Sequence, residues 1–388
     1  MINHTLPEAF FLASGLGIWE PLYWRSSLAK KFYSVYTLIN VTIAFFLMIM
    51  ELMALIVLTE NLNDFAEASY IFLAGLSGCI KGATLLLRRK QVVALINELL
   101  RQNCTPQNIK EMQICSHYNK IARYTVLLYA ILVSISSGIS AILPCFLAPV
   151  KYVLQVKAWH PYEITNDLIY WCTYVQHGLG ILIQAGWNAI NDTMIAGFMI
   201  QSCAQLDLIS CRLQMLPENT KAAFSRNISK AQIKRLEAQV IKESVLHHLQ
   251  IFKFVNDLKY TFAPSIVVQF CLSLIIICVS IYGLTSERSN IPVSFMLMFL
   301  SSMLAELFIY CWFGNEITIK SLEFSEAICK SDWPELQTET LKGLLIMMFR
   351  TSPIVINFGP FINLSVDSYV GILKLSYSAF NVLQSSSS

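Results

Sequence analysis

Long apolar runs separated by polar segments are the dominant pattern of this 388-residue chain. Seven of these runs reach about 20 residues, the length that a helix needs to cross the hydrocarbon core of a bilayer. They fall at residues 35–59, 68–87, 124–147, 169–200, 261–285, 292–313 and 363–384. Because an open sheet cannot satisfy its backbone in lipid, the pattern predicts an all-α membrane protein with seven transmembrane helices.

Two polar segments carry helical patterns of their own. From Ala231 to Lys259, apolar residues recur at helical spacing, which predicts that the fourth and fifth membrane helices extend beyond the bilayer through 201–260. The apolar run from Leu341 to Phe349 is too short to span a membrane, so it predicts a packing helix within 314–362. Such elements would form an anchor layer on which neighbouring subunits dock.

The N-terminal segment, residues 1–34, contains one short apolar patch from Ala9 to Ile18. No basic residue precedes the patch and Glu20 follows it, so we expect an amphipathic interfacial element and not a signal peptide. The predicted organisation then continues with helices one to six over 35–313. The anchor region 314–362 follows, and the seventh helix and the C-terminus occupy 363–388.

The distribution of charge predicts the orientation of the chain. Apolar residues make up 55% of the sequence and charged residues 14%, against roughly 25% charged in soluble domains. The net charge of +3 leaves no basic surplus for a nucleic-acid partner. Segments 1–34, 88–123, 201–260 and 314–362 hold 23 Lys and Arg residues, and the alternate segments hold three. The positive-inside rule therefore predicts a cytoplasmic N-terminus and an extracellular C-terminus. A seven-helix G-protein-coupled receptor has the opposite orientation.

Motifs of enzymes and metal sites are absent from the sequence. It contains no G-x-x-x-x-G-K-[ST], H-E-x-x-H or G-x-S-x-G. His247 and His248 are adjacent, so on a helix they point about 100° apart and cannot share a metal. The eleven cysteines include no C-x-x-C pair and lie mostly in apolar runs, as small membrane hydrophobes do. We expect no enzyme activity, no metal and no cofactor.

Five ionisable residues fall within predicted spans. Burying a charge in the bilayer costs free energy, so a functional role is the first hypothesis for each such residue. They are Glu51, Lys81, Asp192, Glu306 and Lys374. Structural pairing, for example of Glu51 with Lys81, is favoured over a role in transport. A secondary transporter would show inverted repeats and broken midplane helices, and the sequence has neither.

Aromatic residues gather near the predicted outer ends of the helices, among them Tyr170 and Trp171. They fit either an interfacial aromatic belt or an apolar ligand pocket with a few polar groups. The residues that we expect in such a pocket are Tyr70, Phe72, Ser137, Tyr174, His177, Phe295, Met296 and Phe299. Tyr70, Tyr174 and Phe299 are the foremost candidates.

The C-terminal third resembles the insect odorant receptor family. The run FIYCWFGNEITIKSLEFSEAICKSDWPEL, with Cys311, Gly314, Asn315, Ser321 and Trp333, is similar to the sixth-helix and anchor signature of that family. LLIMMFRTSPIVINFGPF followed by LSVDSYVGILKLSYSAFNVLQ resembles its seventh-helix segment, and WHPYEITN before the fourth helix is also similar. The resemblance covers most of the chain and is weak in the first 120 residues.

This resemblance implies a tetrameric, ligand-gated, non-selective channel for monovalent and divalent cations, with a seventh helix from each subunit around one pore. Volatile organic ligands would bind in the outer half of a tuning subunit, which works with the odorant co-receptor. The expected location is the plasma membrane of olfactory-neuron dendrites. The co-receptor has an insertion that 201–260 lacks, so the chain resembles a tuning subunit. Gustatory receptors, the alternative, end in a pattern that the region after Tyr377 does not match.

The last helix has a stripe that would suit a pore. Lys374, Ser378 and Val382 recur every four residues and so share one face, flanked by Asn381 and Gln384. The resemblance implies that Val382 forms a narrow apolar gate, which closes by excluding water. Alternatively, Lys374 snorkels or pairs with Asp367 or Glu306. For the subunit anchor we expect Trp333, Leu344 and Ile346.

Overall fold

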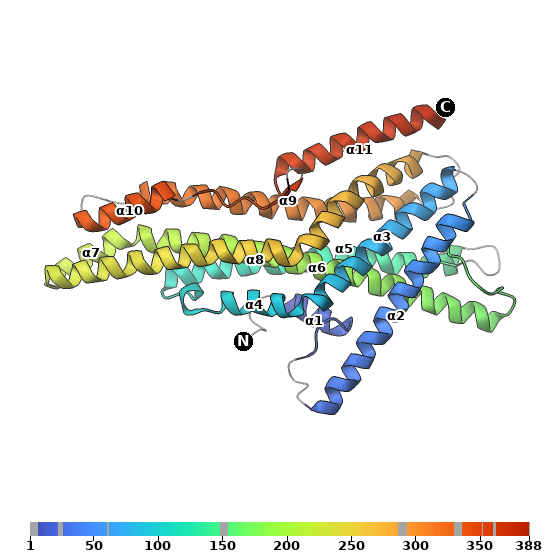
Figure 1. Cartoon of the computed structure of the whole chain (residues 1–388), viewed down its shortest axis with the longest axis horizontal. Coiled ribbons are helices and arrows are strands. Elements are labelled where there is room, and N and C mark those ends of the chain that lie inside the picture. Colours follow the sequence, from blue (N-terminus) through green and yellow to red (C-terminus); the bar gives the residue numbers. More distant parts are fainter. Residues whose placement is uncertain are drawn as a thin grey trace.

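The computed structural model describes residues 7–21, 26–59, 62–147, 154–285, 293–329, 336–350, 352–359 and 362–387. These residues are helical almost throughout, as Figure 1 shows. The helices are α1 (Pro7–Gly15), α2 (Ser27–Val57), α3 (Leu62–Leu87), α4 (Arg89–Leu99), η2 (Gln102–Cys104), α5 (Ile109–Leu147), α6 (Asp167–Gln214), α7 (Leu216–Ser225), α8 (Lys230–Thr285), α9 (Val293–Cys329), α10 (Thr338–Arg350) and α11 (Val366–Ser387). A short antiparallel hairpin, β1 (Asn357–Phe358) and β2 (Ile362–Asn363), precedes α11.

The predicted membrane spans fall on α2, α3, α5, α6, α8, α9 and α11, so the all-α prediction is confirmed. Six helices among the described residues are long and apolar enough to cross a membrane, and α11 is not one of them. The 22 residues of α11 have the required length. Its serines, Asp367 and Lys374 interrupt the apolar run. A helix of this composition is better suited to line a polar path than to face lipid on all sides.

Two of the helices are much longer than a bilayer is thick. α6 has 48 residues and α8 has 56, so at about 1.5 Å per residue they extend about 70 and 84 Å. A hydrocarbon core needs only about 30 Å of this length. The remainder forms the extension seen at the left of Figure 1, where α7 and α10 pack beside it. The helix predicted over 231–259 lies entirely within α8.

A proline interrupts the backbone ladder of α8. Pro264 has no N–H, so the carbonyl of Tyr260 four residues earlier loses its partner in the helix. Arg88, between α3 and α4, donates a hydrogen bond from Nη1 to this carbonyl and another to the carbonyl of Thr261 at 3.2 Å. The guanidinium therefore replaces the hydrogen bond that the proline removes.

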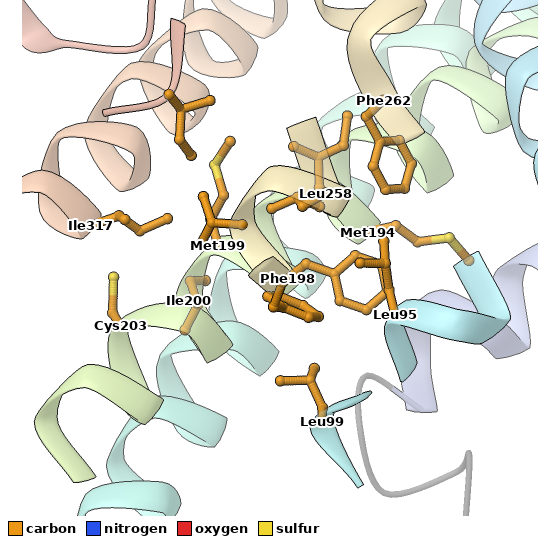
Figure 2. Close-up of a cluster of buried hydrophobic side chains, with 14 of the residues drawn as sticks. Leu95, Leu99, Met194, Phe198, Met199, Ile200, Cys203, Leu258, Phe262 and Ile317 are labelled. Atoms are coloured by element: carbon orange, nitrogen blue, oxygen red, sulfur yellow. The ribbon is translucent and has the colours of Figure 1, made fainter. Parts of the chain in front are cut away.

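The main apolar core lies where α4, α6, α8 and α9 meet, and Figure 2 shows its centre. Phe198 on α6 stands between Phe254 and Phe262 of α8, with ring centroids 6.1 and 6.2 Å away. The same buried cluster contains Leu95, Leu99, Met194, Met199, Ile200, Cys203, Leu258 and Ile317. α6 is buried on all sides here, which explains why its residues are apolar around the whole circumference of the helix.

The N-terminal patch is packed into this bundle as α1 and the turn after it. Ala9, Phe10 and Ala13 are buried, whereas Phe11 is exposed. The Trp187 indole of α6 donates a hydrogen bond to the Leu16 carbonyl at 3.2 Å. The predicted interfacial element is thus a helix that covers the side of α5 and α6 with one face.

Candidate functional site

The first group of predicted ligand residues lies between α3 and α9. The rings of Tyr70 and Phe299 are in contact, with centroids 5.4 Å apart, and Tyr70 and Met296 are both buried. Phe72 is half-buried on α3. Phe295 lies in the first turn of α9, but its side chain is outside the described residues. This group supplies aromatic and thioether surface, which suits an apolar ligand.

The second group lies on α5 and α6. Tyr174 is buried and donates a hydrogen bond from its hydroxyl to the Ala141 carbonyl at 2.9 Å. His177 is fully buried and stacks on His160, with Nε2 atoms 3.2 Å apart. Ser137 is half-buried and donates to the Val133 carbonyl of its own helix. The contacts of these residues run to α5 and to the loop before α6, and so differ from those of Tyr70 and Phe299.

The loop over residues 154–166 forms hydrogen bonds to α2, α5 and α6. The Trp159 N–H donates to the Met50 carbonyl of α2 at 3.1 Å. Gln155 donates from Nε2 to the Tyr174 carbonyl of α6 at 2.9 Å. Burial lowers the pKa of His160, so a neutral ring at this position can share one proton with His177. Sequence reasoning missed these contacts, although the family-like motif WHPYEITN lies here.

A buried charge cluster corrects the pairing expected for Lys81. Its ammonium contacts Asp192 of α6 at 2.8 Å and Glu306 of α9, and not Glu51. The Tyr129 hydroxyl donates to Asp192 Oδ2 at 2.9 Å, and Tyr310 donates to Oδ1. All five side chains are buried. One ammonium and two tyrosine hydroxyls thus satisfy two carboxylates, which makes the burial of charge tolerable.

Glu51 lies elsewhere, between α2, α3 and α6. Its side chain is 2% exposed, and Oε2 has no hydrogen-bond partner among the described residues. A Cβ placed on Gly75 of α3 would lie 2.7 Å from this oxygen, and 3.1 Å from Oε1 of Gln184. The predicted pair with Lys81 fails because helix rotation directs Lys81 toward α6 and α9.

Residues of the family-like signature hold the segment that leads into α11. The Ile354 N–H donates to Ser321 Oγ at 2.9 Å, and Thr318 Oγ1 donates to the Ile354 carbonyl at 2.9 Å. A Cβ on Gly314 would lie 2.4 Å from Cβ of Leu364, so only glycine permits this approach. The signature therefore fixes the start of α11 against α9.

The predicted pore stripe lies on the exposed face of α11. Lys374, Ser378, Asn381 and Val382 are exposed, whereas Ser376 and Phe380 on the opposite face are buried. Gln384 lies in α11, with its side chain outside the described residues. Glu306, one of the partners considered for Lys374, is held by Lys81.

The predicted anchor residues differ in their surroundings. Leu344 on α10 is 2% exposed and belongs to the core of the chain itself, so it cannot serve as a surface contact. Ile346 is 62% exposed on the other face of the same helix, and Phe349 is 87% exposed. Trp333 lies outside the described residues.

The long apolar helices define a multi-pass helical membrane protein. The chain belongs to the odorant receptor family, because the family model described as 7tm Odorant receptor matches residues 61–377.

Individual relatives agree with this family. Odorant receptor Or1 of Anopheles gambiae is 24% identical over 84% of this chain and 82% of its own length. Odorant receptor 46a, isoform B, of Drosophila melanogaster is 23% identical over 95% of both chains. The structure of the olfactory receptor OR5 from Machilis hrabei in complex with eugenol aligns with a TM-score of 0.85 over 99% of both chains, at 15% identity. The fold is therefore that of an insect olfactory receptor.

Proposed function

We propose that this chain is an odour-tuning subunit that binds a small, largely apolar volatile molecule and opens a non-selective cation channel together with odorant co-receptor subunits. Membership of the odorant receptor family is the observation that carries the proposal. The buried contact of Tyr70 with Phe299 and the exposed polar stripe of α11 support it.

The test is whole-cell recording from cells that express this chain with the co-receptor, during application of a panel of volatiles. We expect inward current that persists when G-protein signalling is blocked from inside the cell. Cells with the co-receptor alone should respond to the volatiles of the panel differently from cells with both chains. If surface expression is normal and both cell types respond identically, the chain does not tune the channel.

The proposed topology places the N-terminus in the cytoplasm and the C-terminus outside, in the plasma membrane of sensory dendrites. The excess of Lys and Arg in alternate segments supports this direction. An epitope placed after Ser388 should be accessible to antibody on intact cells. If it becomes accessible only after permeabilisation, the orientation is reversed.

In the proposed pocket, Tyr70, Tyr174 and Phe299 contact the ligand. Apolar volatiles offer few hydrogen-bonding groups, and one methylene is worth only about 1–3 kcal/mol of discrimination, so tuning should be graded. Alanine at Tyr70 or Phe299 should reorder the preferred volatiles and preserve surface expression. Tyr174→Phe separates contact from support, because it removes only the hydroxyl that bonds to Ala141. An unchanged order of ligands in all these variants would place the pocket elsewhere.

In the proposed pore, the face with Lys374, Ser378 and Val382 lines the ion path, Asn381 and Gln384 lie at its edges, and Val382 forms the gate. A ring of apolar side chains closes a channel by excluding water. Val382→Ser should therefore produce current without a ligand or change ion selectivity. Ile372→Ser changes a half-buried apolar residue on the other side of the same helix and is the matched control. Equal resting currents in the two variants would argue against this face.

A further inference from the structure

A crevice of about 990 Å³ opens between α1, α2 and α5, and its lining includes none of the residues of the proposed pocket or pore. Its walls are mainly apolar, with Phe10 and Phe11 from α1, Phe32 from α2, and Leu127 and Ile131 from α5. This volume lies at the upper end of the range for small-molecule pockets. The site can therefore accommodate a sizeable apolar group.

Three hydroxyl groups along the walls have partners within the chain, and the wall carboxylate of Glu20 lies 3.9 Å from Arg89. Tyr36 donates its hydroxyl to the Gly15 carbonyl at 2.6 Å, and Tyr33 donates to the Trp19 carbonyl at 2.8 Å. Ser14 donates to the Phe10 carbonyl at 2.9 Å. An occupant therefore meets mostly hydrocarbon and ring surface, and an alkyl chain would leave no wall group newly unsatisfied.

One end of the crevice is charged. Arg123, Leu127, Ala130 and Ser134 share one face of α5, with the arginine a turn before the apolar wall begins. The Arg123 guanidinium contacts the lining residue Glu8 through Nε at 3.0 Å, and its side chain remains 67% exposed. Its terminal nitrogens can therefore reach a second anion.

A second cation lies beside the crevice. A shallow neighbouring hollow on α2 shares Phe32 with it and is lined by Lys31. Both cations lie just before the predicted spans that begin at residues 35 and 124, so they fall at the boundary of the membrane. The apolar walls continue from this boundary into the span.

We propose that this crevice binds one anionic phospholipid of the surrounding bilayer, with an acyl chain along Leu127, Ala130 and Ile131 and a headgroup of net negative charge beside Arg123. Exposed apolar residues adjoin the crevice on both outer helices, including Leu28 of α2 and Leu128 of α5, so the bilayer has direct access. The two acidic lining residues, Glu8 and Glu20, are each paired with an arginine. An amphiphile with a net anionic head therefore matches a site that is apolar along its length and has the exposed cations Arg123 and Lys31 beside one end.

The experiment uses the full chain, co-assembled with the co-receptor, in nanodiscs that contain phosphatidylserine with a diazirine on one acyl chain. After irradiation, labelled peptides are quantified by mass spectrometry, and phosphatidylcholine with the same diazirine is the parallel probe. We expect phosphatidylserine to label the 127–134 segment in preference to other lipid-facing segments. Arg123→Gln should reduce this labelling about fivefold, the effect of one lost basic contact near a membrane surface. It should leave phosphatidylcholine labelling unchanged.

Two further variants separate the crevice from general lipid contact. Ala130→Trp fills the crevice and should abolish preferential labelling, and Ser134→Trp does the same from a more exposed position if the first variant folds poorly. Leu128→Trp changes an exposed residue of the same helix outside the crevice and should have no effect. Equal labelling by the two lipids, or equal loss in the Leu128 variant, would overturn the proposal. Preferential labelling that arises only after deletion of residues 2–6 would show that the chain's own N-terminus occupies the site.

Discussion

Lys81 on α3 has charged partners on two other helices, α6 and α9. Its side chain therefore contributes to the packing of several helices. Its ammonium bridges Asp192 and Glu306, and Tyr129 joins the same carboxylates from α5. This arrangement links α3, α5, α6 and α9 within the apolar interior. Removing one partner of a buried ion pair leaves an uncompensated charge, which costs far more than the pair itself contributes.

We therefore expect Lys81→Met to destabilise the protein by about 3–5 kcal/mol, seen as a lower melting temperature of the solubilised protein. Lys157→Met breaks an exposed pair with Asp64, 2.9 Å apart, and is the control. The cost there should be about 0.2–1 kcal/mol. Combining Lys81→Met with Asp192→Asn and Glu306→Gln should restore much of the loss. Equal effects of the two single variants would mean that the cluster carries no special stability.

His160 gives the loop over residues 154–166 a predictable dependence on pH. Burial lowers its pKa in the folded loop below the value of about 6.5 found in unfolded chains. The open loop therefore binds more protons at low pH, and the contact with His177 is fully stable only above about pH 6.5. Hydrogen exchange of residues 154–166 should accelerate as the pH falls below this value, after correction for intrinsic rates.

A glutamine at position 160 can still form a hydrogen bond with His177 but cannot gain a proton. His160→Gln should therefore weaken this pH dependence. His117→Gln, at an exposed position on α5, should retain it. If the exchange rate changes with pH equally in the wild type, His160→Gln and His117→Gln, a group other than His160 controls the loop.

At the scale of elements, α8 remains one helix across Pro264 because a side chain from another element compensates for the lost N–H. Arg88 donates to the carbonyl of Tyr260, the group that the proline leaves without a partner. The bend of α8 is thereby coupled to the junction of α3 and α4. No pattern in the sequence around Pro264 indicates this contact, because Arg88 lies 172 residues away from Tyr260.

A double-mutant cycle tests this compensation. Arg88→Ala should cost about 1.5–3 kcal/mol, the range for hydrogen bonds to charged groups. In a Pro264→Ala background the helix supplies its own N–H, so the same change should cost clearly less. The melting temperatures of the wild type, the two single variants and the double variant give the coupling energy between Arg88 and Pro264. Strict additivity would show that Arg88 stabilises the chain by some other contact.

At the scale of the whole molecule, α10 has one face in the core and one face on the surface. Leu344 is buried, whereas Ile346 and Phe349 on the same helix are exposed. Apolar side chains this exposed on a segment outside the predicted spans are typical of an interaction surface. Substitutions on the buried face and on the exposed face of α10 can therefore be compared separately.

Glutamate at both Ile346 and Phe349 should weaken co-purification with the co-receptor and leave the amount of folded single chain unchanged. Leu344→Glu should instead reduce the folded chain itself, because a charge enters the core. Fluorescence-detected size exclusion of the two tagged chains distinguishes these outcomes. Full co-purification of the Ile346 and Phe349 double variant would place the subunit contact elsewhere.

The sequence alone determined the helical membrane architecture and the family. The length and apolarity of a run depend only on residues close together in the chain, so all seven predicted spans fall on helices. The family could be recognised because its motifs around Gly314 and Ser321 are also short, continuous stretches of sequence. The same local pattern could indicate that α10 packs, but not which residues face inward. It also indicated that charged residues within spans would pair.

Only the tertiary structure decided which groups meet. Lys81 contacts Asp192 and Glu306 because α3 is rotated so that this side chain faces α6 and α9. Glu51 belongs to α2 and lies beside Gly75, on a different side of α3. Which side chains pair depends on which helices are neighbours and on the rotation of each helix about its axis. The helical repeat relates only residues close together in sequence, so it gives no information on residues more than 100 positions apart. The crevice at α1 likewise exists only because a short N-terminal helix packs on α5 and α6 and faces α2 across the opening.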